Sequence, residues 1–343
     1  MTPALAFFYG GMVDKKNILN TLTLSFICIG LITIQWFLIG YSFVFEPGSR
    51  GLGDVSSAAL YDWSPDQPSI YSSTIPKFAH AAFECAFAIV TPAIMSGAVV
   101  GRIKFKVYVV FILLWSTFVY DVLAHWIWSS NGWLKYLGLI DFAGGMVVHM
   151  SSGVSALVAS LLVGKRVAAS RGQEKHLSFT LLGVGLLWVG WHGFNGGSAL
   201  AASGTAAVAL FNTNLAAAGG MITWLAMDAA LLAGHAPRIA SAAFGFVVGL
   251  VGVTPAAGLV HPGWALVIGI VTCMFSWAVT EVLRKVQWLD DTLDVFACHG
   301  VGGAVGSLMV GLFADVRKLL VFHFIFIPVE SRITPKKFTF QFG

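Results

Sequence analysis

The sequence predicts an all-α polytopic membrane protein, and three observations support this fold class. Of the 343 residues, 57% are hydrophobic and only 10% are charged, whereas soluble domains carry about 25% charged residues. Apolar segments long enough to cross a bilayer recur along the chain with short polar breaks. The basic residues, in turn, gather in alternate breaks. The net charge of +4 is explained by this basic excess on one membrane face, so no nucleic acid partner is expected.

The apolar segments predict nine full spans and one partial span. A helix needs about 20 residues to cross the hydrocarbon core. The first dozen residues, MTPALAFFYGGM, resemble the end of a span whose beginning is absent, and no signal peptide is expected. The full spans are expected near 21–45, 77–100, 105–128, 142–164, 178–200, 206–233, 239–260, 263–283 and 294–314.

The distribution of Lys and Arg predicts the orientation of the chain. One set of alternate loops holds 12 of the 20 basic residues, the opposite set holds three, and the C-terminal segment holds five. Cytoplasmic loops carry the basic excess in membrane proteins. We therefore expect the N-terminal side to lie outside the cell.

Paired motifs predict an internal repeat of five plus five spans. FFYGG (7–11) closes the partial span and GFNGG (193–197) closes the sixth. Asp141 with His149 marks the fifth span, and Asp294 with His299 marks the tenth. Because five is odd, the two halves must be inverted in the membrane. Inverted repeats usually hold a transport site at their interface near the midplane.

Five acids fall in or near the predicted spans, namely Glu84, Asp121, Asp141, Asp228 and Asp294. An ionisable residue inside the membrane indicates a functional site by default. Asp141 and Asp294, however, each stand where a helix is expected to begin, so we favour helix capping over direct chemistry. Asp121 and Asp228 are expected to be solvated or paired.

His149 and His299 each lie inside an apolar span and are followed by small residues, MSSG and GVGG. Small residues let neighbouring backbones approach closely, and the inverted repeat would bring the two rings together. Two adjacent imidazoles in apolar surroundings favour neutrality and can share one N–H···N bond. Imidazoles alone make no case for a metal, so no metal or other cofactor is expected. The absence of an HExxH or nucleophilic serine motif argues against an enzyme.

Four stretches together identify the chain as a member of the ammonium transporter (Amt/Mep/Rh) family, with most similarity to the Amt/Mep branch. They are DFAGGMVVHMSSG (141–153), GWHGFNGGSA (190–199), GLVGVTPAAG (249–258) and DDTLDVFACHGVGGAVGSLMVGLFA (290–314). The resemblance runs in order from residue 1 to about 314. It implies the ammonium-transporter fold, a homotrimer with one pore in each subunit, and a location in the plasma membrane.

The resemblance also implies roles for ten residues of this chain. His149 and His299 match the twin pore histidines, while Trp191 and Thr254 match further pore or vestibule positions. The vestibule positions that recruit the cation are matched by Trp128, Ser198, Phe83 and Asp141. The two gate positions are matched by Phe87 and Phe194. Asp141 would support the recruitment site without touching the substrate.

The physics of a dry pore favours ammonia as the species that passes. A cation–π contact supplies about 2 kcal/mol and a charge-assisted hydrogen bond about 1.5–3 kcal/mol. Moving a bare cation into apolar surroundings costs on the order of tens of kcal/mol. We therefore expect the cation to leave a proton behind, which either returns outside or follows by a separate route. Glu84 stands where the family often has an amide or another uncharged residue, and we expect it to face sideways into a neighbour and not into the pore. His192 is a candidate for pH-dependent tuning of recruitment.

The ends of the chain depart from the family. The first span is incomplete, an eleventh span is missing, and the segment after GLFAD has an apolar core of only ten residues (319–328). We therefore divide the chain into a membrane domain at 1–314 and a divergent tail at 315–343. A truncated, frameshifted or mis-spliced reading frame explains this tail, and a genuine interfacial tail is the alternative. Three functions remain open: transport of ammonium or ammonia, sensing with little flux, or a non-conducting fragment. The missing family tail weakens the expectation of a PII-type regulator on the cytoplasmic face.

Overall fold

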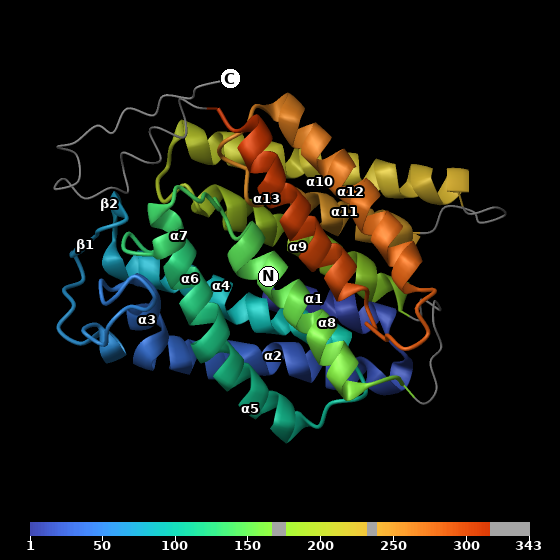
Figure 1. Cartoon of the computed structure of the whole chain (residues 1–343), viewed down its shortest axis with the longest axis horizontal. Coiled ribbons are helices and arrows are strands. Elements are labelled where there is room, and N and C mark those ends of the chain that lie inside the picture. Colours follow the sequence, from blue (N-terminus) through green and yellow to red (C-terminus); the bar gives the residue numbers. More distant parts are fainter. Residues whose placement is uncertain (167–175, 232–238, 316–343) are drawn as a thin grey trace, which may run out of the picture.

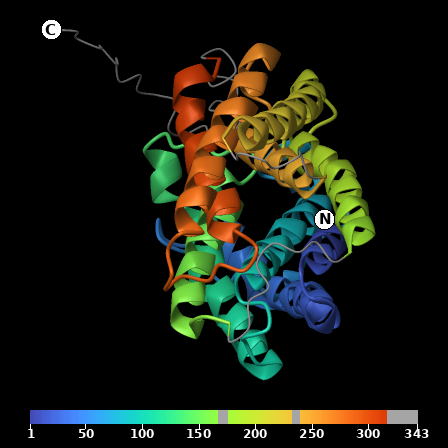
Figure 2. The same ribbon diagram turned by 90° about the vertical axis from the view of Figure 1, so that its right-hand side faces the viewer.

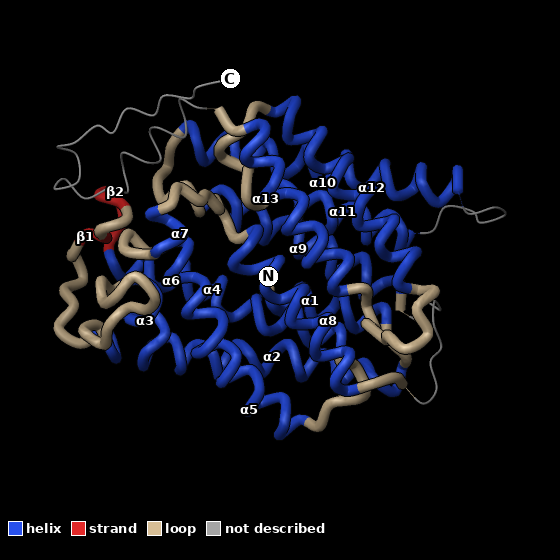
Figure 3. Tube along the Cα trace, in the orientation of Figure 1, coloured by secondary structure: helices blue, strands red, loops and turns tan. Residues whose placement is uncertain are grey.

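Long apolar helices make up most of the chain (Figures 1 and 3). The computed structural model describes residues 1–166, 176–231 and 239–315, so most of the segment expected to form a divergent tail lies outside the described residues. The α-helices are α1 (Thr2–Met12), α2 (Ile18–Gln35), α3 (Tyr41–Phe45), α4 (Lys77–Met95), α5 (Phe105–Trp115), α6 (Asp121–Trp128), α7 (Trp133–Tyr136), α8 (Ser151–Val163), α9 (Leu177–Gly197), α10 (Gly204–Leu231), α11 (Ile239–Val253), α12 (Pro262–Leu283) and α13 (Gly302–Phe313).

Eight helical stretches in the described part of the chain are long and apolar enough to cross a membrane. They agree with eight of the nine full spans predicted from the sequence and occupy Lys15–Phe45, Lys77–Ala98, Phe105–Tyr136, Gly145–Val163, Leu177–Gly197, Gly204–Leu231, Pro262–Leu283 and Phe296–Phe313. The ninth, expected at 239–260, is shorter because α11 ends at Val253. Pro255 accounts for this end, since proline lacks an N–H donor and disfavours helical geometry in the preceding residue.

Four of the spans contain a π-helical segment, which widens the helix by one residue in that turn. In the described residues these segments are η2 (Trp36–Gly40), η5 (Ser116–Tyr120), η6 (Gly145–Met150) and η7 (Phe296–Val301). The last two carry His149 and His299. Such segments occur frequently at functional sites.

The helices form two sets that lie side by side. Figures 1 and 2 show α1 to α8, coloured blue to green, mostly below α9 to α13, coloured yellow-green to red. The sets meet where α8 packs against η7 and where α13 packs against η6. The fold is therefore an all-α membrane bundle in which the fifth span of each half reaches the interface between the halves.

Each end of the bundle has its own polar structure. At one end, β1 (Pro68–Ser69) pairs with β2 (Ser72–Pro76), and we call this end the hairpin face (Figure 3). At the other, Arg166 binds Asp290 through two side-chain hydrogen bonds of 2.9 and 2.7 Å. Burial alone raises the pKa of Asp290, but the hydrogen bonds and charge of Arg166 outweigh it and hold that pKa below its ordinary value.

Candidate functional site

Two histidines meet at the centre of the bundle, as the paired motifs predict. The Nδ1 atoms of His149 and His299 lie 3.1 Å apart, and both rings are buried. Their ring centroids are 5.2 Å apart with planes inclined by 29°. At this distance one Nδ1 donates and the other accepts, so the two rings cannot both be imidazolium.

Small residues allow the two histidine helices to approach this closely. A Cβ atom on Gly153 would lie 2.1 Å from the backbone nitrogen of Gly300, and one on Gly303 would lie 2.4 Å from the carbonyl oxygen of Gly145. Both distances are far below van der Waals contact. Glycine at these positions is therefore a condition for the imidazole pair.

Asp141 caps the segment that carries His149, which confirms the capping interpretation. Its Oδ1 accepts from the backbone N–H groups of Gly144 (2.9 Å) and Gly145 (2.6 Å). Its Oδ2 accepts from Met146 (2.7 Å) and Val147 (3.1 Å). Gly144 makes this turn possible because its φ is +104°, a conformation that side chains rarely tolerate. The carboxylate thus satisfies the free N–H groups that begin a buried helix.

We expect Asp141→Ala to lower the free energy of unfolding by about 2–3 kcal/mol. The reason is that four buried N–H groups lose a charged acceptor together. Asp141→Asn, which keeps an oxygen acceptor, should lower the free energy of unfolding by roughly half as much. The measurement is thermal unfolding of the purified protein in detergent.

The matched control is Asp54→Ala. Asp54 caps the exposed backbone of Ser56 (2.9 Å), so its loss should change stability by less than about 0.5 kcal/mol. Equal unfolding temperatures for Asp141→Ala and Asp54→Ala would contradict the role given to Asp141.

A column of aromatic rings leads to the histidine pair. Phe87 and Phe194 stack with their centroids 4.1 Å apart, so their faces are in contact. Phe83 lies edge-on to Phe87 at 4.9 Å, and Trp128 lies edge-on to Phe87 at 5.6 Å. The indole N–H of Trp128 donates to the backbone oxygen of Asp141 (2.9 Å). Asp141 therefore fixes both the start of the His149 segment and the position of Trp128.

The remaining predicted positions lie around this column. Trp191 stacks on His149 at 5.3 Å, and its indole N–H donates to the hydroxyl of Thr254 (3.0 Å). The hydroxyl of Ser198 donates to the backbone oxygen of Phe194 (2.8 Å), which leaves its oxygen lone pairs to accept. Each of the ten predicted positions thus contacts at least one other of the ten, through side-chain or backbone atoms.

A narrow apolar cavity lies beside the histidine pair. Apart from the two imidazoles its lining is hydrophobic, and it is formed by Met1, Leu5, Val90, Ile94, His149, Leu187, Trp191, Phe194, Val247 and His299. The Nε2 atom of His149 has no hydrogen-bond partner among the described residues. The cavity can therefore offer a small uncharged guest only the imidazole nitrogens of these two histidines as polar side-chain partners.

Among the acids, the capping role expected of Asp294 was wrong, whereas Asp121 and Asp228 are paired, which is one of the two outcomes expected for them. Asp291, rather than Asp294, accepts from the backbone N–H of Phe296 (2.7 Å), while the Asp294 carboxylate pairs with Arg284 (3.2 Å). The reason is that Asp294 adopts a φ of +52°, a left-handed turn conformation. Asp228 accepts from the indole of Trp277 (2.8 Å), and Asp121 accepts from Gln35 (2.6 Å). No group of three or more metal-ligating side chains occurs in the described ranges.

The fold and the buried pair together define an integral membrane transport protein. Comparison with known proteins identifies the family: residues 1–334 match the Ammonium Transporter Family. An ammonium transporter of Bacillus subtilis is 43% identical over 315 residues, which is 92% of this chain and 77% of the relative. A putative ammonium transporter of Methanothermobacter thermautotrophicus is 43% identical over 312 residues, covering 91% of this chain and 76% of that one.

Solved structures agree with this assignment. Candida albicans Mep2 superposes with a TM-score of 0.87 at 37% identity, covering 93% of this chain and 71% of that one. A sensor Amt protein superposes with a TM-score of 0.84 at 26% identity, covering 95% of this chain and 84% of that one. The chain belongs to the ammonium transporter family, whose members are membrane transporters and not enzymes.

Proposed function

We propose that this chain recruits ammonium at an aromatic vestibule, removes one proton, and passes ammonia along the His149–His299 pair. The observation that carries the proposal is the 3.1 Å contact between the two Nδ1 atoms inside an apolar cavity. A cation there would lose its hydration at a cost on the order of tens of kcal/mol. A neutral molecule with donor and acceptor atoms fits the imidazole line far better.

Recruitment is assigned to Trp128 and Ser198. The indole face of Trp128 gives a cation–π contact of about 2 kcal/mol, and the Ser198 oxygen accepts from an ammonium N–H group. These contacts favour the charged form at the entrance only. Beyond them, Phe87 and Phe194 are stacked at 4.1 Å, so one ring must rotate before any guest can pass.

The fate of the proton separates two forms of the mechanism. If it returns to the side of entry, transport is electrically neutral; if it follows by a separate route, uptake carries charge. In either form we propose that the hairpin face lies outside the cell, that the protein resides in the plasma membrane, and that three copies form a homotrimer. A PII-type regulator would bind the opposite face.

Flux measured in liposomes tests the proposal. The purified chain, given an inward ammonium gradient, should raise uptake above that of protein-free liposomes. Trp128→Ala should raise the half-saturating ammonium concentration by about thirtyfold, the equivalent of about 2 kcal/mol. A voltage-sensitive dye recorded in the same vesicles separates neutral from charged transport.

Trp264→Ala is the matched control, since Trp264 is exposed and stacks on Phe313 away from the column. It should leave uptake unchanged. Specific binding of ammonium without flux would favour the sensor alternative, for which the likeness to the sensor Amt protein is the supporting observation. Failure to elute as a folded trimer from a sizing column would favour the non-conducting fragment.

A further inference from the structure

Two buried carboxyl groups, on α4 and α6, are not part of the side-chain arrangement assigned to the pore. Glu84 on α4 is 8% exposed, and Asp121 at the start of α6 is fully buried. Glu84 Oε2 and Asp121 Oδ1 have no hydrogen-bond partner among the described residues. Neither residue contributes to the arrangement assigned to ammonium.

Two further polar side chains complete this acidic cluster. Gln35 donates its Nε2 to Asp121 Oδ2 at 2.6 Å, but its Oε1 has no partner in the described part of the chain. Tyr120 is fully buried, its hydroxyl is likewise unpaired there, and it interacts electrostatically with both Glu84 and Asp121. Four buried oxygens therefore point to a ligand that the protein itself does not supply.

No lysine or arginine in the described ranges forms an ion pair with either acid. Glu84 has one basic neighbour, His80, whose Nε2 lies 3.9 Å from Glu84 Oε1. Each carboxylate, if ionised, would bear a large desolvation cost in these apolar surroundings. Binding a proton removes that cost and gives each carboxyl group an O–H donor.

π-Helical segments of the backbone border the acidic cluster, as they do the histidine pair. The π-helical segments η6 and η7 hold the pore histidines, and the other two, η2 and η5, border the acidic cluster. Gln35 immediately precedes η2, while Tyr120 ends η5 and is followed by Asp121. Every π-helical segment in the described residues thus adjoins a group of buried titratable or polar side chains.

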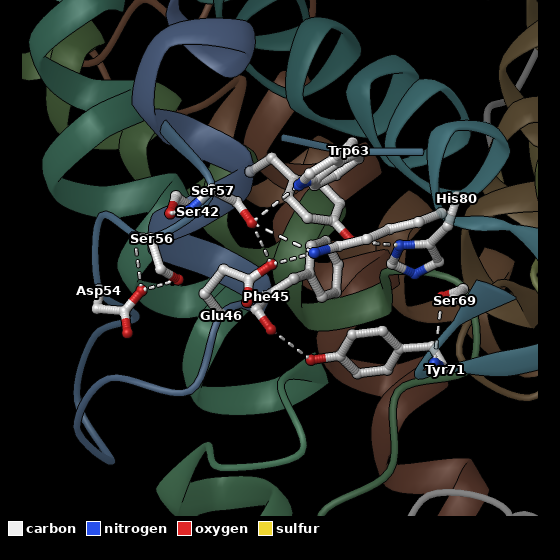
Figure 4. A network of polar contacts seen from close by, with 12 residues as sticks. Ser42, Phe45, Glu46, Asp54, Ser56, Ser57, Trp63, Ser69, Tyr71 and His80 are labelled. Carbon is white, nitrogen blue, oxygen red and sulfur yellow. Dashed lines mark hydrogen bonds and ion pairs between the residues drawn. The ribbon is translucent and has the colours of Figure 1, made fainter. Parts of the chain in front are cut away.

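A line of hydrogen-bonding groups connects Glu84 to the hairpin face. His80 Nδ1 lies 3.2 Å from the hydroxyl of Tyr41. The Tyr41 ring lies 5.9 Å from the ammonium of Lys77, which pairs with Glu46 at 2.7 Å. Figure 4 shows Glu46, Ser57 and Trp63 gathered at the outer end of this line, close to His80 and Tyr71. The 3.9 Å step from His80 to Glu84 is short enough for one bridging water.

We propose that Glu84 and Asp121 form a proton-binding site, separate from the twin-histidine pore, that exchanges protons with the hairpin face through His80 and Tyr41. The site goes beyond the proposed function, because it holds protons whether or not ammonia passes. The titratable and charged groups that the contacts place around it are Tyr41, Glu46, Tyr71, Lys77, His80, Cys85 and Tyr120.

Infrared difference spectroscopy at neutral pH tests for the bound protons. The carbonyl stretch of a protonated carboxyl group should be present in the wild type and should lose intensity in both Glu84→Gln and Asp121→Asn. Subtracting each variant from the wild type isolates one residue. This matters because burial raises the pKa of Asp291 to about 7, so Asp291 contributes to the same band. Asp54→Asn, in an exposed loop, is the matched control and should produce no difference band.

Deuterium exchange tests the route. His80→Phe keeps the ring that stacks on Tyr71 at 4.9 Å but removes both nitrogens, so exchange of the isolated band should slow by about a hundredfold. Difference spectra without a carboxyl band in folded Glu84→Gln and Asp121→Asn would overturn the site. Unchanged exchange in His80→Phe would overturn the route. Ammonium flux measured on the same samples shows separately whether the transport proposal holds.

Discussion

Ammonium flux should fall by about ten- to a hundredfold when His149 or His299 is replaced by leucine. Leucine has a volume close to that of histidine but offers no hydrogen bond to a guest in an otherwise apolar cavity. Each lost hydrogen bond to a buried polar molecule costs about 1–3 kcal/mol, and about 1.4 kcal/mol corresponds to a tenfold change in rate. The remaining histidine also loses its partner at 3.1 Å. Initial rates in liposomes provide the measurement.

Replacing both histidines should reduce flux by a smaller factor than the product of the two single reductions, since the rings act as one unit. His261→Leu is the control, because His261 is exposed at the start of α12 and caps only the local backbone of Gly263. Its flux should match the wild type. Wild-type flux after both pore histidines become leucine would remove the proposed mechanism.

Gly153→Ala should abolish the histidine contact although it leaves both histidines in place. The added methyl group would lie 2.1 Å from the Gly300 nitrogen and 2.4 Å from its Cα atom, both of which are backbone. Backbone cannot rotate away as a side chain can, so α8 and η7 must separate. Overpacking of this kind costs about 1–3 kcal/mol. We expect a lower unfolding temperature together with a loss of flux comparable to that of the histidine variants.

Gly30→Ala is the matched substitution within α2, where no atom lies within 4 Å of the added methyl group. It should leave flux unchanged and add up to about 1 kcal/mol of stability, since alanine favours helix over glycine. Full flux in Gly153→Ala would show that the close approach of the two helices is unnecessary for transport.

Much of the fold was predictable because a bilayer imposes strong constraints on sequence. The length of an apolar run and the deficit of charge locate a span without reference to its neighbours. An acid followed by a histidine occurs in both halves, at Asp141–His149 and Asp294–His299, and this repeat predicted that the two rings meet; their 3.1 Å contact confirms it. The end of α11 was misplaced because the apolar character continues through Pro255 although the helix does not.

The features that sequence reasoning missed depend on backbone geometry. Periodicity does not distinguish a π-helical turn from an α-helical one, so η2, η5, η6 and η7 were not predicted. Asp291 and Asp294 are three residues apart in one turn, and only the positive φ of Asp294 decides which carboxylate reaches Phe296. The ion pair of Lys77 with Glu46 joins residues from opposite ends of a long loop, a pairing that composition cannot specify.

The hydrogen bond between the two imidazoles makes the halves of the bundle chemically unequal. One ring holds the central hydrogen and presents a bare nitrogen on its far side, while the other presents an N–H group there. The two rings are therefore opposite tautomers, and at any instant the hydrogen bond between them points in one direction along the pore. A guest that donates a hydrogen to the bare nitrogen of one ring and accepts one from the N–H group of the other would reverse this direction. Successive guests would therefore meet the hydrogen bond in opposite directions.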